Sequence, residues 1–563
     1  MQIERLPQIA KTDRTERFYL IALAALCAVV FFYGLGWLPF IGPDEPRYAQ
    51  IAREMLVTGD WVTPRLGEIK WFEKPALTFW LSAAGYALFG ENEFAARFGV
   101  AVVAGLGVAL LYFFGRRVHS ARFGYLSATA LATCGLWPGF ARGATFDLPL
   151  AVAIELALFS FFLWESEEGE RERGRGRGGE MWGLFAFALG LATLAKGLVG
   201  IVLPLAIITP YLVLTRRWKV VLKPRLLALG ALIFLATAAV WYAPVMARNG
   251  REFIDEFFIA HHFQRYLSNK YRHPQPFFFF PLVAFAGGFP WSFWLVSNGW
   301  RSLKRWRESL DDRLRLFLWL WVIAPVLFFS FSESKLPGYI LPIFPAVALL
   351  VGEELDRWLS ERPPSKAFGF LTAMLIVAVG IGSGVVLQRE LGVGARDAWI
   401  MAAITISIAV VYFGLLLARG ARAATFYLPF GLAVIVIAAA HLVFPGLGKR
   451  ESLRELSLMA VQAARPAERL VFFVNQDHGI NFYATGLPLR DNRSDLVTAM
   501  SPDEIALLIE ASRSRSLLVA SRKRWSDGVM KSEKLRVDII GEQGFNARCS
   551  PGCDWVLLRA RKK

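Results

Sequence analysis

Residues 18–48 read FYLIALAALCAVVFFYGLGWLPFIGPDEPRY, an apolar run followed closely by two carboxylates that stand between two prolines. A membrane span needs about 20 mainly apolar residues, and residues 18–38 supply them. Basic residues precede this run, as in a signal peptide, but the apolar core of a signal peptide has only about 7–15 residues and ends at a small-residue cleavage site. We therefore predict a retained first span with the N-terminus in the cytoplasm.

The composition of the whole chain also indicates a membrane protein. Of its 563 residues, 55% are hydrophobic and 19% are charged, and the mean hydropathy is +0.42. Soluble domains contain about 45–50% apolar and about 25% charged residues. The 63 Lys and Arg exceed the 46 Asp and Glu by 17, and basic cytoplasmic loops explain such an excess in an apolar chain. No nucleic-acid partner is therefore predicted.

Twelve further apolar runs follow the first, so the sequence predicts about 13 spans. The runs lie near residues 94–114, 121–139, 146–164, 181–197, 198–215, 226–244, 277–297, 314–331, 338–355, 367–388, 397–418 and 423–444. The basic loops all fall on the cytoplasmic side if the segment 75–89, which is short and begins at a proline, lies on the membrane instead of crossing it. Residues 39–93 then form one long periplasmic loop whose helices contact membrane lipids, and residues 245–276 form another.

The runs 181–197 and 198–215 meet at Lys196-Gly197 with almost no loop between them. The turn must therefore lie near the outer interface. A lysine there either extends toward the lipid headgroups or faces a site.

An odd number of spans places the C-terminus outside, and the composition becomes polar and mixed after residue 444. We predict a transmembrane catalytic domain over 1–444 and a small α/β extracytoplasmic domain over 445–563. Strand-like runs occur at 470–474 and 517–520, and a helix over 501–512 would be capped by its first serine.

Two cysteines of the predicted C-terminal domain, Cys549 and Cys553, can form a small disulfide in an oxidising compartment. Zinc binding is the alternative, but it lacks two further ligands.

Carboxylates occur at the predicted outer ends of the spans. Asp44 and Glu45 follow the first span and either cap a helix or bind a cation or sugar. Asp147 stands at the mouth of the fourth span, where a carboxylate is costly without a partner or a task.

Basic residues beside aromatic residues occur in three outer segments. Lys74 follows Trp71-Phe72-Glu73, Arg265 lies in His261-His262-Phe263-Gln264-Arg265-Tyr266, and Lys335 precedes Leu336-Pro337-Gly338-Tyr339. Cations with apolar neighbours at lipid depth suit a lipid-linked phosphate. The adjacent His261 and His262 are candidate ligands for a divalent metal, although neighbouring side chains diverge in helices and in strands.

These motifs, in their order and on their side of the membrane, resemble the GT-C membrane glycosyltransferases. More narrowly, they are similar to the 4-amino-4-deoxy-L-arabinose (aminoarabinose) lipid A transferases, which are related to the protein O-mannosyltransferases and oligosaccharyltransferases. The resemblance rests on Asp44-Glu45-Pro46-Arg47-Tyr48, Phe72-Glu73-Lys74-Pro75, Lys196-Gly197, His262-x-x-Arg265 and Lys335-Leu336-Pro337-Gly338-Tyr339. It implies a mainly α, polytopic GT-C fold.

The resemblance also implies an activity. The donor would be aminoarabinose on undecaprenyl phosphate, the acceptor a lipid A phosphate, and the place the periplasmic face of a Gram-negative inner membrane. The product would give resistance to polymyxin and cationic peptides. Transfer would invert the anomeric centre and require no cofactor.

By position, the resemblance assigns roles to individual residues. Asp44 would be the catalytic carboxylate and Asp147 would assist it. The donor phosphate would be bound by Lys74, Arg265 and Tyr339. The residues that contact the sugar or shape the site would be Glu45, Tyr48, Glu73 and Lys335. His261 departs from the pattern, because glutamate stands before the matching histidine in relatives.

Two alternatives remain open from the sequence. A GT-C enzyme can instead transfer another polyprenyl-linked sugar, or use a protein hydroxyl as acceptor, which would need a general base. A lipid flippase or transporter would place its polar groups near the bilayer midplane. The polar groups gather at the outer interface here, which favours an enzyme.

Overall fold

The computed structural model describes residues 14–67, 69–171, 179–257, 274–360, 366–475, 477–491, 496–512, 514–543 and 555–563. Five residues with predicted roles, His261, His262, Arg265, Cys549 and Cys553, lie outside these ranges.

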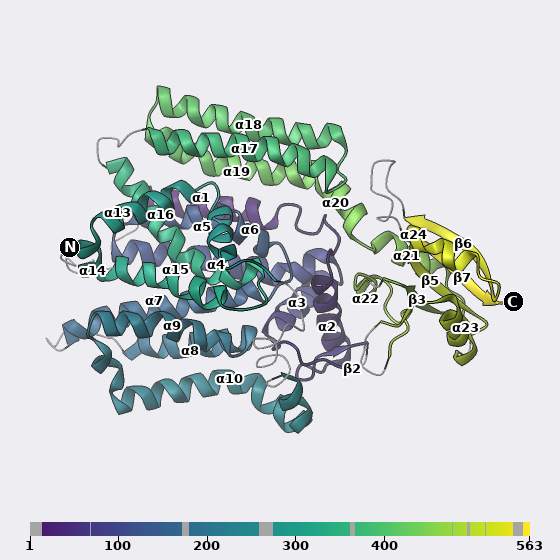
Figure 1. Cartoon of the computed structure of the whole chain (residues 1–563). Coiled ribbons are helices and arrows are strands. Elements are labelled where there is room, and N and C mark those ends of the chain that lie inside the picture. The colour runs from purple at the N-terminus through teal and green to yellow at the C-terminus, as the bar shows by residue number, and fades with distance from the viewer. Residues whose placement is uncertain are drawn as a thin grey trace.

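Helices, many of them long and running side by side, build most of the molecule (Figure 1). They are α1 (Arg14–Cys27) with η1 (Ala28–Phe32), α4 (Glu93–Val118), α5 (Ala121–Thr133), α6 (Leu136–Ala141), α7 (Asp147–Arg171), α8 (Gly179–Lys196), α9 (Val199–Leu214), α10 (Pro224–Phe253), α12 (Phe279–Gly287), α13 (Ser292–Lys304), α15 (Arg313–Ser330), η5 (Pro337–Ile343), α16 (Phe344–Ser360), α17 (Ala367–Arg389), α18 (Ala395–Ala418) and α19 (Ala421–Leu442). Every predicted apolar run falls on one of these helices or on a consecutive pair.

The number of spans is smaller when each helix is judged alone. Among the described residues, nine helices are long and apolar enough to cross a membrane, or ten if α12 and α13 together form one bent span. The sequence predicts this pair as one continuous run, but the chain bends by 119° between the two helices. Pro290 between them cannot donate the backbone hydrogen bond that would continue a helix. The total of 13 stays a prediction.

The long loop after the first helix carries two helices, α2 (Asp44–Thr58) and α3 (Leu77–Phe89), and a small hairpin of β1 (Arg65–Leu66) and β2 (Ile69–Lys70). In Figure 1, α2 and α3 run across the direction of the long helices at one end of the bundle. With 13 residues, α3 is too short to cross a bilayer. The structure thus places a helix within the segment 75–89, as predicted.

A five-stranded sheet follows the bundle, in the order β4-β3-β5-β7-β6. The first three of these strands are parallel, and β7 is antiparallel to both β5 and β6. The strands are β3 (Arg469–Phe473), β4 (Thr498–Ala499), β5 (Ser516–Arg522), β6 (Leu535–Gln543) and β7 (Trp555–Lys562), and the helices are α20 (Phe444–Glu451), α21 (Arg454–Ala463), α22 (Ile480–Tyr483), α23 (Pro502–Ala511) and α24 (Lys523–Met530). The Ser501 hydroxyl accepts a hydrogen bond from Glu504 N, so the predicted cap is present.

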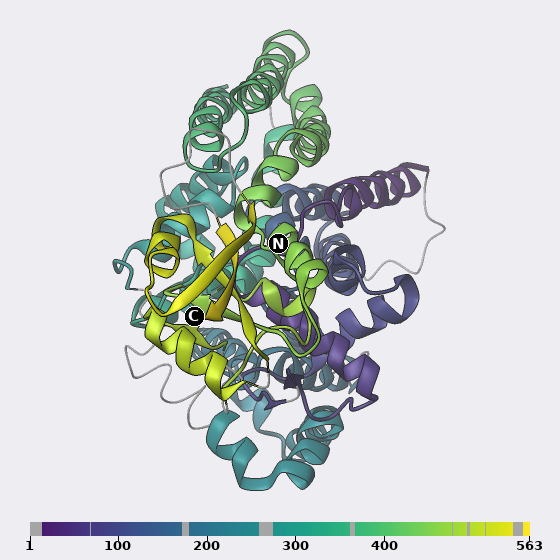
Figure 2. The same cartoon turned by 90° about the vertical axis from the view of Figure 1, so that its right-hand side faces the viewer.

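The sheet lies in front of the end of the bundle in Figure 2 and contacts the long loop there through α22. The Tyr483 hydroxyl accepts a hydrogen bond from Phe40 N at 2.8 Å and donates one to Glu93 at 2.8 Å. The Arg53 guanidinium lies 4.6 Å from the centre of the Phe482 ring. These contacts hold the backbone that leads into α2.

Glu468 and Arg559 form a buried ion pair in the C-terminal domain, at 2.9 Å, and the Ser516 hydroxyl donates to the same carboxylate at 2.5 Å. Burial alone would raise the pKa of Glu468, but the hydrogen bonds from Arg559 and Ser516 hold it below its usual value.

A carboxyl whose pKa is lower in the folded state contributes stability above its unfolded pKa of about 4.3, and this stability is lost as the pH falls through the folded pKa. We expect Glu468→Gln to remove this pH dependence and to lower the free energy of unfolding of the domain at pH 7 by about 3 kcal/mol, because Arg559 is left buried and unpaired. Hydrogen exchange of β5 and β7 in the full chain, corrected for intrinsic rates, measures both effects. Glu542→Gln, which breaks the exposed pair with Lys523, is the matched control and should change little.

Candidate active site

A cavity of about 1100 Å³ opens at the end of the bundle that carries α2 and α3. It is lined mainly by apolar side chains, but among the described residues eight charged ones also line it. These are Asp44, Glu45, Glu73, Lys74, Arg97, Arg142, Asp147 and Lys196. An apolar cavity with a few convergent charges is the usual form of a small-molecule site.

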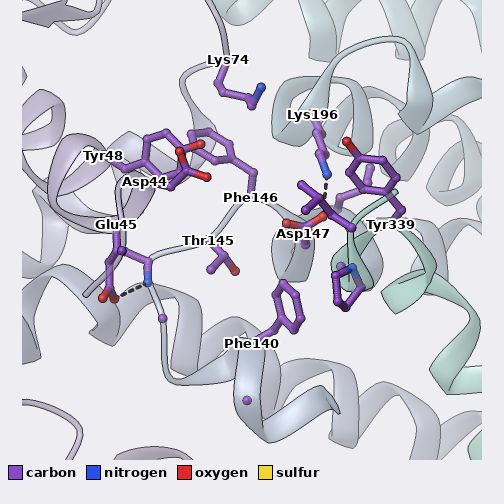
Figure 3. A pocket seen from close by; sticks show the side chains of 18 of the residues that line it. Asp44, Glu45, Tyr48, Lys74, Phe140, Thr145, Phe146, Asp147, Lys196 and Tyr339 are labelled. Carbon is purple, nitrogen blue, oxygen red and sulfur yellow. Dashed lines mark hydrogen bonds and ion pairs between the residues drawn. The ribbon is translucent and has the colours of Figure 1, made fainter. Parts of the chain in front are cut away.

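Asp147 is the first residue of α7, where a carboxylate is favoured by the helix dipole. Its Oδ1 accepts a hydrogen bond from Lys196 Nζ at 2.5 Å, and the two side chains are only 20% and 19% exposed. Lys196 ends α8, and Gly197 follows with a φ of 76°, which glycine adopts without strain. Of the two roles left open for Lys196, the structure places it in the cavity (Figure 3).

Tyr339 lies on the other side of Lys196, whose Nζ is 5.1 Å from the centre of the Tyr339 ring. The neighbouring Gly338 brings η5 close to α7, because a Cβ at this position would lie 2.9 Å from Asp147 Cγ. The Lys196 ammonium is therefore held between a carboxylate and an aromatic face, next to the Tyr339 hydroxyl (Figure 3).

Asp44 is the first residue of α2, and Pro43 occupies the N-cap position without a side-chain cap. The Asp44 side chain is exposed to the cavity, and no hydrogen bond or ion pair joins it to another residue in the described ranges. In Figure 3 it lies across the cavity from Asp147, with Thr145 between them. The geometry thus favours a carboxylate that meets a ligand over one that caps the helix.

Glu45 has a different environment, although it is adjacent to Asp44. Both of its oxygens accept hydrogen bonds from Arg97 at 2.7 Å, and one of them also accepts from Ala144 N at 3.0 Å. Arg97 is 2% exposed. Its guanidinium also donates to the carbonyls of Leu35 and Leu38. Glu45 therefore joins α2 to α4 and to the segment before α7.

Tyr48 packs beneath Asp44, with its ring at 4.7 Å from that of Phe146 and perpendicular to it. Burial, followed by the nearby Asp44 carboxylate, raises the pKa of the Tyr48 hydroxyl well above its usual value. This hydroxyl stays protonated at neutral pH and supports the wall of the cavity next to Asp44.

Some of the remaining predicted residues line the cavity, and others lie behind the lining. Glu73 and Lys74 both line the cavity, and Lys74 Nζ lies 3.4 Å from the carbonyl oxygen of Glu73. Lys335 is not a lining residue: it is buried and donates to the carbonyl of Ser332 at 2.6 Å, which fixes the turn before η5. Its predicted role in shaping the site stays a prediction.

No group of three or more His, Cys, Asp or Glu that could hold a metal is found within the described ranges. The metal alternative, which rests on His261 and His262, falls outside them and stays a prediction.

Sequence reasoning did not assign roles to Arg97 and Arg142. The available signal was an ionisable residue within or beside a predicted span, since such residues usually have a partner or a function. Their positions in the cavity depend on contacts between segments far apart in the chain, which no local pattern contains.

The comparisons with known proteins agree with this architecture. The family model described as dolichyl-phosphate-mannose-protein mannosyltransferase matches residues 73–242. The crystal structure of ArnT from Cupriavidus metallidurans bound to undecaprenyl phosphate superposes with a TM-score of 0.75 at 26% identity, over 96% of this chain and 98% of that one. The archaeal oligosaccharyltransferase AglB from Archaeoglobus fulgidus shares the fold, with a TM-score of 0.53 at 13% identity over 91% of this chain and 70% of that one. The chain therefore has the mainly helical GT-C fold of these membrane glycosyltransferases, with a small C-terminal sheet.

Within this class, the sequence is related to the undecaprenyl phosphate-aminoarabinose arabinosyl transferases. The protein of that name numbered 1 from Pseudomonas fluorescens is 33% identical over 360 residues, which are 62% of this chain and 60% of the relative. The protein from Pseudomonas aeruginosa is 36% identical over 344 residues, 60% of this chain and 57% of the relative. The chain thus matches about 60% of the length of these curated relatives.

Proposed function

We propose that this protein transfers 4-amino-4-deoxy-L-arabinose from undecaprenyl phosphate to a phosphate of lipid A, and thereby confers resistance to polymyxin and cationic peptides. The observation that carries the proposal is the cavity in which Lys196 is held between Asp147 and Tyr339, in a chain that superposes over 96% of its length on ArnT bound to undecaprenyl phosphate. The site would lie at the periplasmic face of a Gram-negative inner membrane, with the N-terminus in the cytoplasm and the C-terminus in the periplasm.

Cleavage of the donor leaves negative charge on the departing phosphate, and preorganised cations in a site with little water stabilise such charge strongly. Lys74 lines the cavity, and Lys196 and the Tyr339 hydroxyl stand together on another part of its wall. We propose that they bind the donor phosphate together with Arg265, whose role stays a prediction from the sequence. Asp147 fixes the Lys196 ammonium in place.

The sugar carbon becomes positively charged as the bond to phosphate breaks, and a nearby carboxylate stabilises it. Asp44 is exposed to the cavity and has no partner in the described part of the chain, which suits this role. A phosphate acceptor is already an anion at neutral pH and needs no strong general base. One displacement by the acceptor oxygen then forms the new bond, breaks the old one and inverts the anomeric centre.

A second candidate keeps the site and changes the acceptor. The match of residues 73–242 to a model described as a protein mannosyltransferase favours a hydroxyl acceptor. In that case Asp44 would remove the proton of the attacking hydroxyl.

Mass spectrometry of lipid A from cells with and without the protein tests the proposal. We expect a mass gain of one aminopentose on phosphate, only when the protein is present. Unmodified lipid A, together with a new sugar on protein serine or threonine, would reject the proposed acceptor and favour the second candidate.

We expect Lys74→Ala to raise the KM for the lipid-linked donor about tenfold or more, because the loss of a hydrogen bond to a charged group costs about 1.5–3 kcal/mol. The KM for lipid A should change little. Initial rates at varied donor and acceptor concentrations measure both constants. An unchanged donor KM would remove Lys74 from the phosphate site, and Lys70→Ala is the control, since Lys70 pairs with Glu252 outside the cavity.

A further inference from the structure

Among the described cations that line the cavity, Arg142 differs from the others because its polar contacts are with backbone carbonyls. Arg97 is paired with Glu45 and Lys196 with Asp147, and Lys74 stands beside Glu73. The Arg142 guanidinium donates to the carbonyl oxygens of Val30 at 3.0 Å and Tyr33 at 2.8 Å, and no carboxylate in the described ranges forms an ion pair with it. Its positive charge is therefore available to an anion.

The guanidinium is held in a fixed orientation. Its two carbonyl partners lie at the C-terminal end of η1, and the ring of Phe444 lies 5.4 Å from its central carbon. An arginine side chain carries five N–H donors, and these contacts within the described chain use two of them. A planar group with donors to spare can bind a phosphate with two parallel hydrogen bonds.

Apolar surface lies next to Arg142. The ring of Phe444 faces its guanidinium, and the cavity lining also includes the apolar side chains of Leu35, Leu38 and Ile41. An anion bound at Arg142 would thus lie next to apolar surface, as the phosphate of a lipid requires.

Arg142 and Lys196 are held by different parts of the chain. Arg142 donates to residues 30 and 33, and Arg97, the partner of Glu45, donates to residues 35 and 38 of the same segment. In Figure 3, Glu45 lies on one side of Thr145, and Asp147 with Lys196 lies on the other. Because a single displacement requires the attacking and departing oxygens on opposite sides of the sugar carbon, two phosphates need two separate cationic positions.

We propose that Arg142 binds the phosphate of the acceptor lipid, opposite the donor phosphate at Lys196 and Tyr339. This proposal rests on the proposed function, and it assigns the acceptor position within the same cavity. The ion pair between Arg97 and Glu45 has no net charge. It would hold the segment 30–45 in place and would not compete with Arg142 for the phosphate.

Binding of three probes to the purified full chain tests this assignment without any transfer reaction. The probes are bisphosphorylated lipid A, fully dephosphorylated lipid A and undecaprenyl phosphate. We expect Arg142→Gln to weaken binding of bisphosphorylated lipid A about 10- to 100-fold, since a hydrogen-bonded ionic contact is lost. Binding of dephosphorylated lipid A and of undecaprenyl phosphate should stay the same.

Two further variants separate binding from support of the fold. The side chains of Arg142→Lys and Arg142→Gln can both still donate to a backbone carbonyl, but only lysine keeps the positive charge. Arg142→Lys should therefore retain more affinity for bisphosphorylated lipid A than Arg142→Gln does. Arg454→Gln removes an arginine outside the cavity lining that pairs with Glu93, and it should not alter lipid A binding.

If Arg142→Gln lowered the affinity for phosphorylated and dephosphorylated lipid A equally, the proposal would be overturned. This result would show that Arg142 only holds the end of η1. A lower affinity for undecaprenyl phosphate alone would also overturn the proposal and would assign Arg142 to the binding of the donor phosphate. Phosphate-dependent binding of lipid A that requires Arg142, without any sugar transfer by the wild-type protein, would support the assignment while refuting the proposed function.

Discussion

Asp44→Asn is expected to lower kcat for sugar transfer by about 10³-fold, with the protein still folded and inserted. The substitution keeps the size of the side chain and removes the charge that would stabilise the developing positive sugar. Loss of one preorganised electrostatic contact at a reacting centre typically costs about 10²- to 10³-fold. Because Asp44 has no partner within the described ranges, its neutralisation breaks no known ion pair, and the effect should appear in kcat with little change in donor binding. Single-turnover transfer from the lipid-linked donor measures it.

Glu45→Gln is the matched control for this variant, because it neutralises the adjacent carboxylate. Here the Arg97 guanidinium loses its ionic partner while it is almost completely buried, so the main effect should be a loss of stability of about 3 kcal/mol or more. Normal transfer by Asp44→Asn would reject the catalytic role of Asp44.

The second large effect is expected for Lys196→Met, which keeps the length of the side chain and removes its ammonium. We expect kcat/KM for the donor to fall about 10²- to 10³-fold, since the cation that faces the departing phosphate is lost. Asp147 would also lose its partner at 2.5 Å, so some loss of stability should accompany the loss of activity. Rates at varied donor concentration and thermal unfolding of the detergent-solubilised protein separate the two effects.

A double-mutant cycle with Asp147→Asn distinguishes two roles of the lysine. If Lys196 only neutralises Asp147, the double variant should recover activity, since no unpaired carboxylate remains. If Lys196 contacts the donor phosphate, as we propose, the double variant should be no more active than Lys196→Met alone. Recovery by the double variant would therefore contradict the proposed contact.

Features of the fold that depend on local composition could be predicted from the sequence. The apolar runs fall on helices because a run of that length and hydropathy has few other structures in a bilayer. The cap at Ser501 is likewise local, as it needs only a hydroxyl and the amide of Glu504 three residues later. The 119° bend between α12 and α13 was missed, although Pro290 lies between them.

The pairings within the cavity could not be predicted in this way. Arg97 and Glu45 are 52 positions apart, and Lys196 and Asp147 are 49 apart. Each pair depends on how α4, α7 and α8 pack, and hydropathy does not determine that packing. The sequence therefore indicates which charged residues stand at the ends of the apolar runs, while the structure is needed to separate the paired Glu45 from the adjacent Asp44.

Tyr483 has a consequence for the synthesis of the protein. Its hydroxyl accepts the amide of Phe40, 443 positions earlier in the chain, and donates to Glu93. Phe40 belongs to the short segment that leads into α2 and Asp44, so this segment lacks the hydrogen bond to Tyr483 until the ribosome has passed residue 483. A nascent chain can insert its first helices long before that point, yet the segment before α2 gains its contact with Tyr483 only afterwards.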